Sequence, residues 1–257
     1  MKLTFNHIAK RFADLHVVDD FSCEVNTGEL VALVGPSGCG KSTLLHIAAG
    51  LEMPTAGEML ADGARVTGPN PERMLMFQEN ALYPWQTLVG NVAMALEFQK
   101  VPKKEARAQA AAWLAKVNLQ GFEDYYPHQV SGGMRQRAAL ARAFITQPKA
   151  LLLDEPFGAL DALTRMTLQD ALRDLIVEAK PTVLLVTHDV EEALFLADRI
   201  LVFSPRPATV LKEFNLAHHE KTHDLSEFVD MRRDILCLLG IHAERDQHAG
   251  KLEGVQS

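Results

Sequence analysis

One short glycine-rich string restricts the fold more than any other part of this 257-residue chain. It reads GPSGCGKS, spans Gly35–Ser42 and fits the pattern G-x-x-x-x-G-K-[ST]. The apolar run Leu30–Val34 leads into it, and Ser42–Ala49 after it is typical of a helix. Backbone N–H groups of such a loop converge on phosphate oxygens when a strand precedes the loop and a helix follows it. The string therefore predicts a phosphate-binding loop.

This loop is predicted to bind a nucleoside triphosphate with Mg²⁺. Lys41 supplies a fixed positive charge, and the Ser42 hydroxyl is suited to the metal ion. Cys39 is interpreted as a small filler residue, because nothing nearby in the sequence identifies a resolving thiol. The nucleotide-binding residues expected in this segment are Gly35, Pro36, Ser37, Gly38, Cys39, Gly40, Lys41, Ser42 and Thr43.

Two further apolar runs end in groups that are suited to phosphate chemistry. The first, ALLLDEP, ends in Asp154 and Glu155, whose side chains point in different directions if the strand continues. Asp154 is suited to the Mg²⁺ shell, and Glu155 to polarising an attacking water. The second run, TVLLVT, is followed by His188, a donor in reach of a γ-phosphate, and by Asp189, which is placed to cap the next helix. For Asp154 and Glu155, the alternative interpretation is a strand that merely ends in solvated acids.

The remaining pattern indicates an α/β fold. Ala150–Leu153 and Thr182–Val186 resemble buried strands of a parallel sheet. Lys103–Asn118 and Gly133–Thr146 favour helices, which predicts a helical insert in the sheet. Lys2–Val25 alternates as antiparallel strands do.

These elements predict a single domain over residues 1–243. The helical insert is expected at approximately 80–147, and 244–257 is expected to be a polar, flexible tail.

The formal net charge of −7 argues against a nucleic-acid partner, which normally selects a basic surface. No apolar run approaches the roughly 18–20 residues of a membrane span, and the amino-terminal sequence does not resemble a secretory signal. The three cysteines are too widely spaced to suggest a zinc site.

The string VSGGMRQR contains Ser131, Gly132 and Gly133 at the start of a predicted helix. Exposed N–H groups at a helix start suit an anionic γ-phosphate. A serine followed by a glycine turn is equally typical of an ordinary helix cap. Local physical chemistry does not distinguish these two interpretations.

The order and spacing of five strings resemble those of an ATP-binding cassette (ABC) ATPase over nearly the whole chain. These strings are GPSGCGKS, FQENALYPW, VSGGMRQR, LLLDEPFGALD and LLVTHD. The resemblance implies a P-loop NTPase fold with a RecA-like parallel-sheet core, an amino-terminal antiparallel β subdomain and an inserted α-helical subdomain. The signature string departs from the family pattern at Val130, where leucine is usual, and at Met134, where glutamine is usual.

The resemblance also assigns roles that the residues alone do not. It implies that Gln78 acts in catalysis and binds the metal, that Asp161 lies beside the nucleotide, and that Phe12 stacks on adenine. A buried strand aromatic is the other interpretation of Phe12. In this family two such subunits form a homodimer in which each ATP lies between the P-loop of one and the signature of the other. Hydrolysis then drives the partner membrane permease between two states.

The strings YPWQTLVGNVAMALE and THDVEEALFLADRILVFSPRP are similar to those of nitrate/sulfonate/taurine-type bacterial importers. The resemblance implies a place at the cytoplasmic face of the inner membrane, together with a permease and a periplasmic or lipid-anchored binding protein. The chain after His188 is too short for the regulatory domain of sugar importers. Two alternatives are an ABC ATPase that acts on nucleic acid and an ATP-gated adaptor without hydrolysis. Intact Glu155, Gln78 and His188 argue against the adaptor.

A last prediction concerns Leu82, Tyr83, Pro84 and Trp85. Large apolar residues in a proline-marked segment suggest an exposed patch, and such a patch usually marks an interface. The family docks its permease in this region, which implies that Trp85 is an anchor. The alternative is that Tyr83 and Trp85 fill the core of the subunit.

Overall fold

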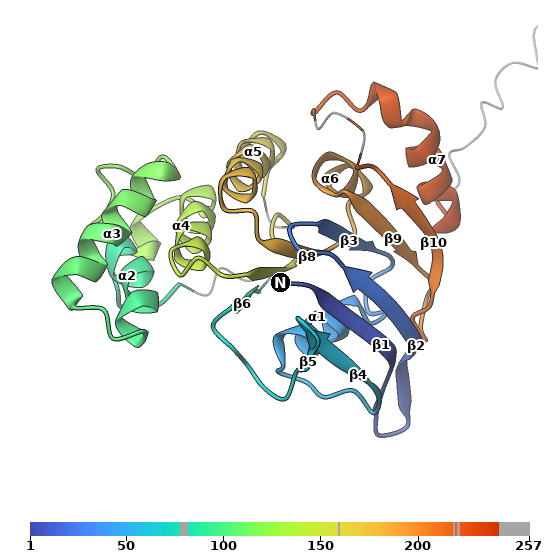
Figure 1. Ribbon diagram of the computed structural model, residues 1–257. Coiled ribbons are helices and arrows are strands. Elements are labelled where there is room, and N and C mark those ends of the chain that lie inside the picture. The colour runs from blue at the N-terminus through green and yellow to red at the C-terminus, as the bar shows by residue number, and fades with distance from the viewer. Residues whose placement is uncertain (78–81, 159, 218, 220–221, 242–257) are drawn as a thin grey trace, which may run out of the picture.

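The computed structural model describes residues 1–77, 82–158, 160–217, 219 and 222–241 (Figure 1). Its centre is a six-stranded sheet with the strand order β10-β9-β3-β8-β7-β6. Five strands run parallel and β10 pairs antiparallel with β9 at one edge. The strands are β3 (Leu30–Val34), β6 (Arg73–Met76), β7 (Ala150–Asp154), β8 (Thr182–Thr187), β9 (Arg199–Phe203) and β10 (Val210–Asn215).

The central strands are apolar on both faces because each face is covered. Val31 and Leu33 of β3 pack in one hydrophobic cluster, whereas Ala32 and Val34 pack in another. The first cluster contains α1 (Lys41–Ala49) and the amino-terminal sheet. The second contains the remaining helices, including α5 (Ala162–Ala179) and α6 (Val190–Leu196). Continuous apolar runs are the expected pattern for parallel strands covered on both faces.

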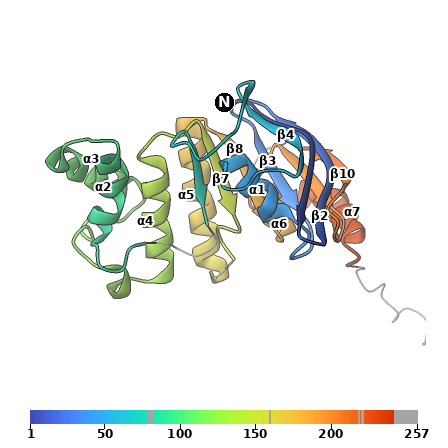
Figure 2. The ribbon, with the colours of Figure 1, turned by 90° about the horizontal axis from the view of Figure 1, so that it is seen from below.

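A smaller antiparallel sheet covers the other side of α1. Its order is β2-β1-β4-β5, formed by β1 (Leu3–Phe12), β2 (Leu15–Val25), β4 (Ala56–Ala61) and β5 (Ala64–Arg65). Figures 1 and 2 show α1 between the two sheets. The strands predicted within Lys2–Val25 are confirmed.

The helical insert projects from one side of the central sheet, as Figures 1 and 2 show. It consists of α2 (Leu88–Phe98), α3 (Lys103–Lys116), the short 3-10 turn η1 (Pro127–Gln129) and α4 (Gly132–Phe144). Its helices pack on one another, and α3 buries only one face, through Ala106, Ala110 and Leu114. The predicted fold class is therefore confirmed. The insert limits 80–147 and the domain limits 1–243 stay predictions.

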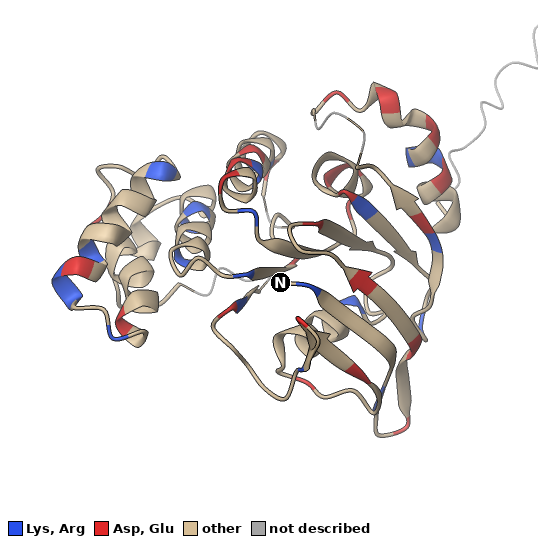
Figure 3. Ribbon diagram, viewed as in Figure 1, with Lys and Arg blue, Asp and Glu red and all other residues tan. Residues whose placement is uncertain are grey.

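The carboxyl-terminal part adds η2 (Ser226–Phe228) and α7 (Val229–Leu238), which packs against α6. Charges of both signs mix along α5 and α7 (Figure 3). The predicted tail 244–257 lies outside the described residues. In the part of the chain that the structure describes, no helix has the length and apolar character needed to cross a bilayer.

Candidate functional site

The predicted phosphate groups meet at one edge of the sheet because three parallel strands end there. The loop follows β3, Glu155 follows β7, and His188 follows β8. The strand register places Val34 beside Thr187, and Val186 beside Asp154. The carboxyl edge of an open parallel sheet is where such folds bind their ligands.

The phosphate loop requires glycine at two positions. Gly40 has φ of 127°, and a Cβ atom there would meet Val17 Cγ1 at 3.0 Å. A Cβ atom on Gly35 would meet Phe203 Cβ at 2.9 Å, although the backbone of Gly35 needs no left-handed conformation. Side chains at these positions would push the loop away from β2 and β9, so the pattern seen in the sequence has a steric reason.

Lys41 is a buried cation with backbone partners. The residue is only 4% exposed, and its Nζ donates to the carbonyl oxygens of Gly35 at 2.7 Å and Pro36 at 2.9 Å. A buried ammonium that is held by neutral carbonyls keeps its charge available for an anion. Cys39 is buried with Sγ 3.9 Å from Nζ, which agrees with its interpretation as a filler.

The helix α1 that follows the loop begins without a side-chain cap. Gly40 occupies the N-cap position, and the first turn carries no acidic residue. The first N–H groups of a helix lack partners within the helix and carry the positive end of its dipole. Ser42 and Thr43 lie in this first turn, so the helix start and Lys41 suit the same phosphate.

Ser42 and Asp154 form the candidate metal site. The Ser42 hydroxyl donates to Asp154 Oδ1 at 2.9 Å, which joins the start of α1 to the end of β7. Burial raises the pKa of Asp154, and the Ser42 hydrogen bond opposes this shift. A hydroxyl and a carboxylate side by side are hard oxygen ligands, which fits Mg²⁺. Gln78, the third predicted ligand, lies outside the described residues.

Glu155 and His188 lie together, as their predicted roles require. Glu155 Oε2 is 3.1 Å from His188 Nδ1, and the side chain of Glu155 is mostly buried whereas that of His188 is exposed. Glu155 has φ of 44°, an uncommon conformation for this residue type, and its N–H donates to Val186 O at 2.9 Å. The backbone turn therefore aims Glu155 toward His188 while Asp154 points to Ser42.

The signature residues lie in a different part of the subunit. Ser131 caps α4 by accepting the Met134 N–H at 3.3 Å, so the cap interpretation is correct, but it leaves phosphate binding open. A Cβ atom on Gly133 would lie 2.4 Å from Thr164 Cγ2, so this glycine allows α4 to approach α5 closely. Figure 2 shows α5 and the strands β7 and β8 between α4 and α1. One chain therefore does not bring the signature to its own phosphate loop.

The structure also places Asp161 and Phe12, two of the predicted nucleotide-binding residues. Asp161 caps α5 by accepting the Thr164 N–H at 3.1 Å, and hydrogen bonds from Thr164 lower the pKa of its carboxyl. Phe12 ends β1 and is 42% exposed, so the interpretation as a buried aromatic is wrong. Lys10 Nζ lies 4.6 Å from the centroid of the Phe12 ring.

A polar network that the sequence does not indicate lies behind His188. Arg165 donates to Asp189 Oδ2 at 2.9 Å and to Leu160 O at 3.1 Å, so it joins the segment after Glu155 to the turn after His188. Asp189 caps α6, as predicted. Glu192 is only 4% exposed and accepts the Thr187 hydroxyl at 3.2 Å. Burial first, and the Asp189 carboxylate second, raises the pKa of Glu192 to about 8.

The fold and this edge define a P-loop nucleotide-binding protein. Comparison with known proteins specifies the family. The ABC transporter family model matches residues 18–158. An uncharacterized ABC transporter ATP-binding protein of Methanocaldococcus jannaschii, MJ0412, is 42% identical over 93% of this chain and 91% of its own length. The aliphatic sulfonates import ATP-binding protein SsuB of Bacillus cereus is 39% identical over 92% of this chain and 95% of its own length.

A solved structure agrees with these relatives. It is the dimeric, post-hydrolysis state of the ATP-binding cassette MJ0796 bound to ADP and Pi, with a TM-score of 0.73 and 30% identity. The match covers 83% of this chain and 98% of the other. The chain therefore belongs to the ABC transporter family, and it is an ATPase of the ATP-binding-cassette type.

Proposed function

We propose that this chain hydrolyses ATP with Mg²⁺ at the carboxyl edge of the central sheet and so powers a bacterial importer. The observation that carries the proposal is the convergence of Lys41, the Ser42–Asp154 pair and the Glu155–His188 pair at the ends of three adjacent strands. Relatives with SsuB names support the import role.

Each side chain contributes a separate part of the reaction. Lys41, the loop N–H groups and the start of α1 hold the phosphates. Ser42, Asp154 and Gln78 would hold Mg²⁺, which when bound neutralises charge on the phosphates. Glu155 accepts a proton from the attacking water, and the burial of its side chain keeps its carboxylate oriented. His188, 3.1 Å from Glu155, donates toward the γ-phosphate.

The catalytic unit is proposed to be a homodimer. The separation of α4 from α1 leaves the signature of each chain free to face a second copy. In that arrangement Ser131, Gly132, Gly133 and Asp161 of one copy complete the site of the other. Phe12 is exposed on the antiparallel sheet, where it is available to stack on adenine. The dimeric state of the MJ0796 cassette supports this arrangement.

Mixed dimers test the arrangement. Ser131→Arg places a cation at the helix start, and Lys41→Ala removes the positive charge that binds the phosphate. Each variant alone is expected to be inactive, but their mixture forms one composite site in which both motifs are intact. We therefore expect ATP hydrolysis in the mixture and none in either parent. Absence of recovery at every mixing ratio contradicts the composite site.

A cluster of exposed aromatic residues is the proposed permease contact. It consists of Tyr83, Trp85, Phe122, Tyr125 and Tyr126, and we call it the aromatic cluster. Its two segments meet at the start of α2, where the N–H groups of Leu88 and Val89 donate to the carbonyls of Tyr125 and Glu123. The ring centroids of Tyr83 and Trp85 are 5.3 Å apart, and those of Phe122 and Tyr125 are 5.2 Å apart.

The prediction that Leu82, Tyr83, Pro84 and Trp85 form an exposed patch is wrong for Leu82. Leu82 is buried at 8% exposure, so it belongs to the core, whereas Trp85 is 68% exposed and the core interpretation of Trp85 and Tyr83 is wrong. Asn91, fully buried in α2, holds the turn by accepting the Tyr83 N–H at 2.6 Å and donating to three carbonyls. The anchored turn presents Trp85 outward. Exposed aromatics on a rigid turn are strong candidates for an interface.

Trp85→Ala is expected to weaken association with the permease about tenfold or more, as for an interfacial aromatic, without changing the melting temperature of the lone subunit. The measurements are pull-down with the membrane permease of the importer and thermal melting of the lone subunit. Phe98→Ala is the matched control, because Phe98 is exposed at the other end of α2. A lower melting temperature with unchanged association would assign Trp85 to folding.

The import partners follow from the same proposal. We place the chain at the cytoplasmic face of the inner membrane, bound to the permease, with a periplasmic or lipid-anchored protein that delivers a small solute. The solute class is nitrate, a sulfonate, taurine or a related compound, and the SsuB names of relatives favour a sulfonate.

A further inference from the structure

The segment between β9 and β10 carries an arginine that the proposed chemistry does not use. Arg206 Nε donates to the carbonyl oxygen of Gly38 at 3.0 Å, and Nη2 donates to the same oxygen. Gly38 lies inside the phosphate loop, 168 residues earlier in the chain. Among the described residues, Arg206 forms no ion pair with a carboxylate, so its charge is not neutralised by a direct contact.

This contact fixes the direction of one peptide group. The C=O and N–H of a planar trans peptide point in opposite directions. Because the Gly38 carbonyl faces Arg206, the N–H of Cys39 faces the interior of the loop, where it lies 3.3 Å from Pro36 O. Lys41 Nζ donates to the same Pro36 oxygen at 2.9 Å. Two of the loop's donors therefore face the interior of the loop and share the Pro36 carbonyl oxygen as their acceptor.

Gly38 needs an external constraint to hold this orientation. Its φ is 74°, and glycine populates positive and negative φ about equally, so the long Cys39–Pro36 hydrogen bond of 3.3 Å is a weak local constraint on the peptide. A guanidinium with two donors on one carbonyl supplies such a constraint, and a charged donor gives a stronger hydrogen bond than a neutral one.

The segment that presents Arg206 is itself anchored. Ser204 Oγ donates to Pro207 O and accepts the Thr209 N–H at 3.1 Å, which closes the turn. The Ala208 N–H donates to Val17 O at 2.9 Å, which ties the turn to β2. Arg206 thus reaches the loop from a support that is separate from the loop.

We propose that Arg206 is a positioning residue of the nucleotide site. By holding the Gly38 carbonyl outward, it keeps the Cys39 N–H on the inner side of the loop, where a bound phosphate can replace the Pro36 oxygen as its acceptor. This inference rests on the proposed binding of ATP at the loop. It predicts that Arg206 acts on affinity for ATP rather than on the hydrolysis step.

The test compares Arg206→Ala, Arg206→Lys and the control Arg65→Gln, an exposed arginine in β5. Equilibrium ATP binding, steady-state hydrolysis and thermal melting are measured on the full chain with Mg²⁺. Loss of the charge-assisted hydrogen bonds to Gly38 O should raise the Kd and KM for ATP about tenfold in Arg206→Ala, with kcat changed by less than about twofold. Lysine should restore part of the affinity because its ammonium can donate to Gly38 O, and Arg65→Gln should match the wild type.

A second measurement separates positioning from general stability. Amide hydrogen exchange at Cys39 without nucleotide should be faster in Arg206→Ala, while the melting temperature stays within about 2 °C of the wild type. Unchanged ATP affinity in Arg206→Ala overturns the inference, whether or not the melting temperature falls. A lower kcat with normal affinity also overturns it. Failure of the wild type to bind ATP instead refutes the proposed function, and the inference with it.

Discussion

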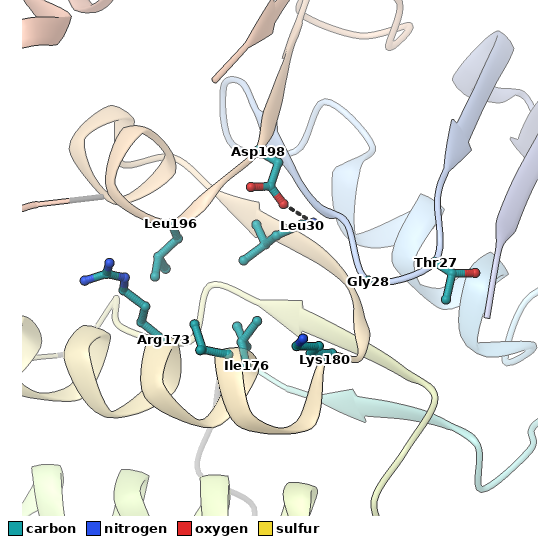
Figure 4. Close-up of a pocket in the computed structure, with 9 residues that line it drawn as sticks. Thr27, Gly28, Leu30, Arg173, Ile176, Lys180, Leu196 and Asp198 are labelled. Carbon is teal, nitrogen blue, oxygen red and sulfur yellow. Dashed lines mark hydrogen bonds between the residues drawn. The ribbon is translucent and has the colours of Figure 1, made fainter. Parts of the chain in front are cut away.

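The two edges of the central parallel sheet differ in how their polar groups are satisfied. At the amino edge, the side chains that begin the strands bind backbone groups of neighbouring strands. Asp198 Oδ2 accepts the N–H of Leu30 at 2.9 Å, which Figure 4 shows beside the surrounding pocket. Thr182 Oγ1 accepts the N–H of Gly28 at 3.1 Å. Arg199 forms ion pairs with Glu29 at 2.7 Å and with Glu213 at 2.8 Å.

At the carboxyl edge, the charged side chains are mostly buried and lie close to one another. Lys41 has carbonyl partners, Asp154 carries a raised pKa, and Glu155 contacts an exposed histidine. Strand-end polar residues therefore serve stability where they complete the backbone's hydrogen bonds. They serve chemistry where burial leaves their charge available to a ligand. Substitutions at the two edges should therefore have opposite consequences.

The largest expected effect is at the carboxyl edge. Glu155→Gln keeps the shape of the side chain but removes the base, so kcat for ATP hydrolysis should fall at least about a hundredfold. ATP binding and the melting temperature should stay near those of the wild type, and size-exclusion chromatography should show an ATP-bound dimer. Hydrolysis near the wild-type rate would remove Glu155 from the catalytic role.

The amino edge should show the reverse pattern. Asp198→Ala leaves the buried N–H of Leu30 without its acceptor, which should cost about 1–3 kcal/mol of the free energy of unfolding. The kcat measured well below the melting temperature should not change. Asp198→Asn is the control, because its amide oxygen can still accept. The comparison between the edges breaks down if Asp198→Ala lowers kcat without lowering the melting temperature.

A pH-dependent effect concerns Glu192, which lies behind the carboxyl edge. Its pKa is raised from the ordinary 4.5 to about 8, so the folded chain keeps a proton that the unfolded chain releases between these values. Stability from this group is therefore present below the lower value and is lost as pH rises toward the higher one, by at most about 1.4 kcal/mol per pH unit. Glu192→Gln should remove this loss, so it should melt above the wild type increasingly as pH rises.

Melting curves across this pH range provide the measurement. Glu191→Gln, an exposed neighbour that pairs with Arg232, should follow the wild type. Parallel pH profiles for Glu192→Gln and the wild type would show that Glu192 is ionised in the folded chain.

The sequence predicted best what depends on neighbouring residues. The strands Leu30–Val34 and Thr182–Val186, the loop between β3 and α1, and the cap at Asp189 are all local patterns. Asp154 and Glu155 could be paired with the loop because parallel strands end at a common edge. The family resemblance supplied the fold class.

Contacts between distant segments could not be predicted. Arg206 meets Gly38 across 168 residues, and nothing in either local sequence indicates the other. The local sequence around Gly133 indicates phosphate binding or an ordinary helix cap, whereas its closest constraint is Thr164 of a different helix. Glu192 resembled an ordinary acid in a first helical turn, and only packing shows that it is buried.

The attachment of the helical insert has an evolutionary consequence. The chain leaves the sheet after β6 and returns at β7, and these two strands are direct neighbours, with Arg73 beside Ala150. Because these strands are parallel, the insert leaves at the carboxyl end of β6 and re-enters at the amino end of β7, and it can lengthen, shorten or change its surface while the strand register beside it stays the same. The insert carries Trp85 and the rest of the aromatic cluster, whereas Lys41 and Glu155 lie in the sheet-based part. On the proposed function, mutation within the insert can alter the permease contact without altering the residues that act on ATP.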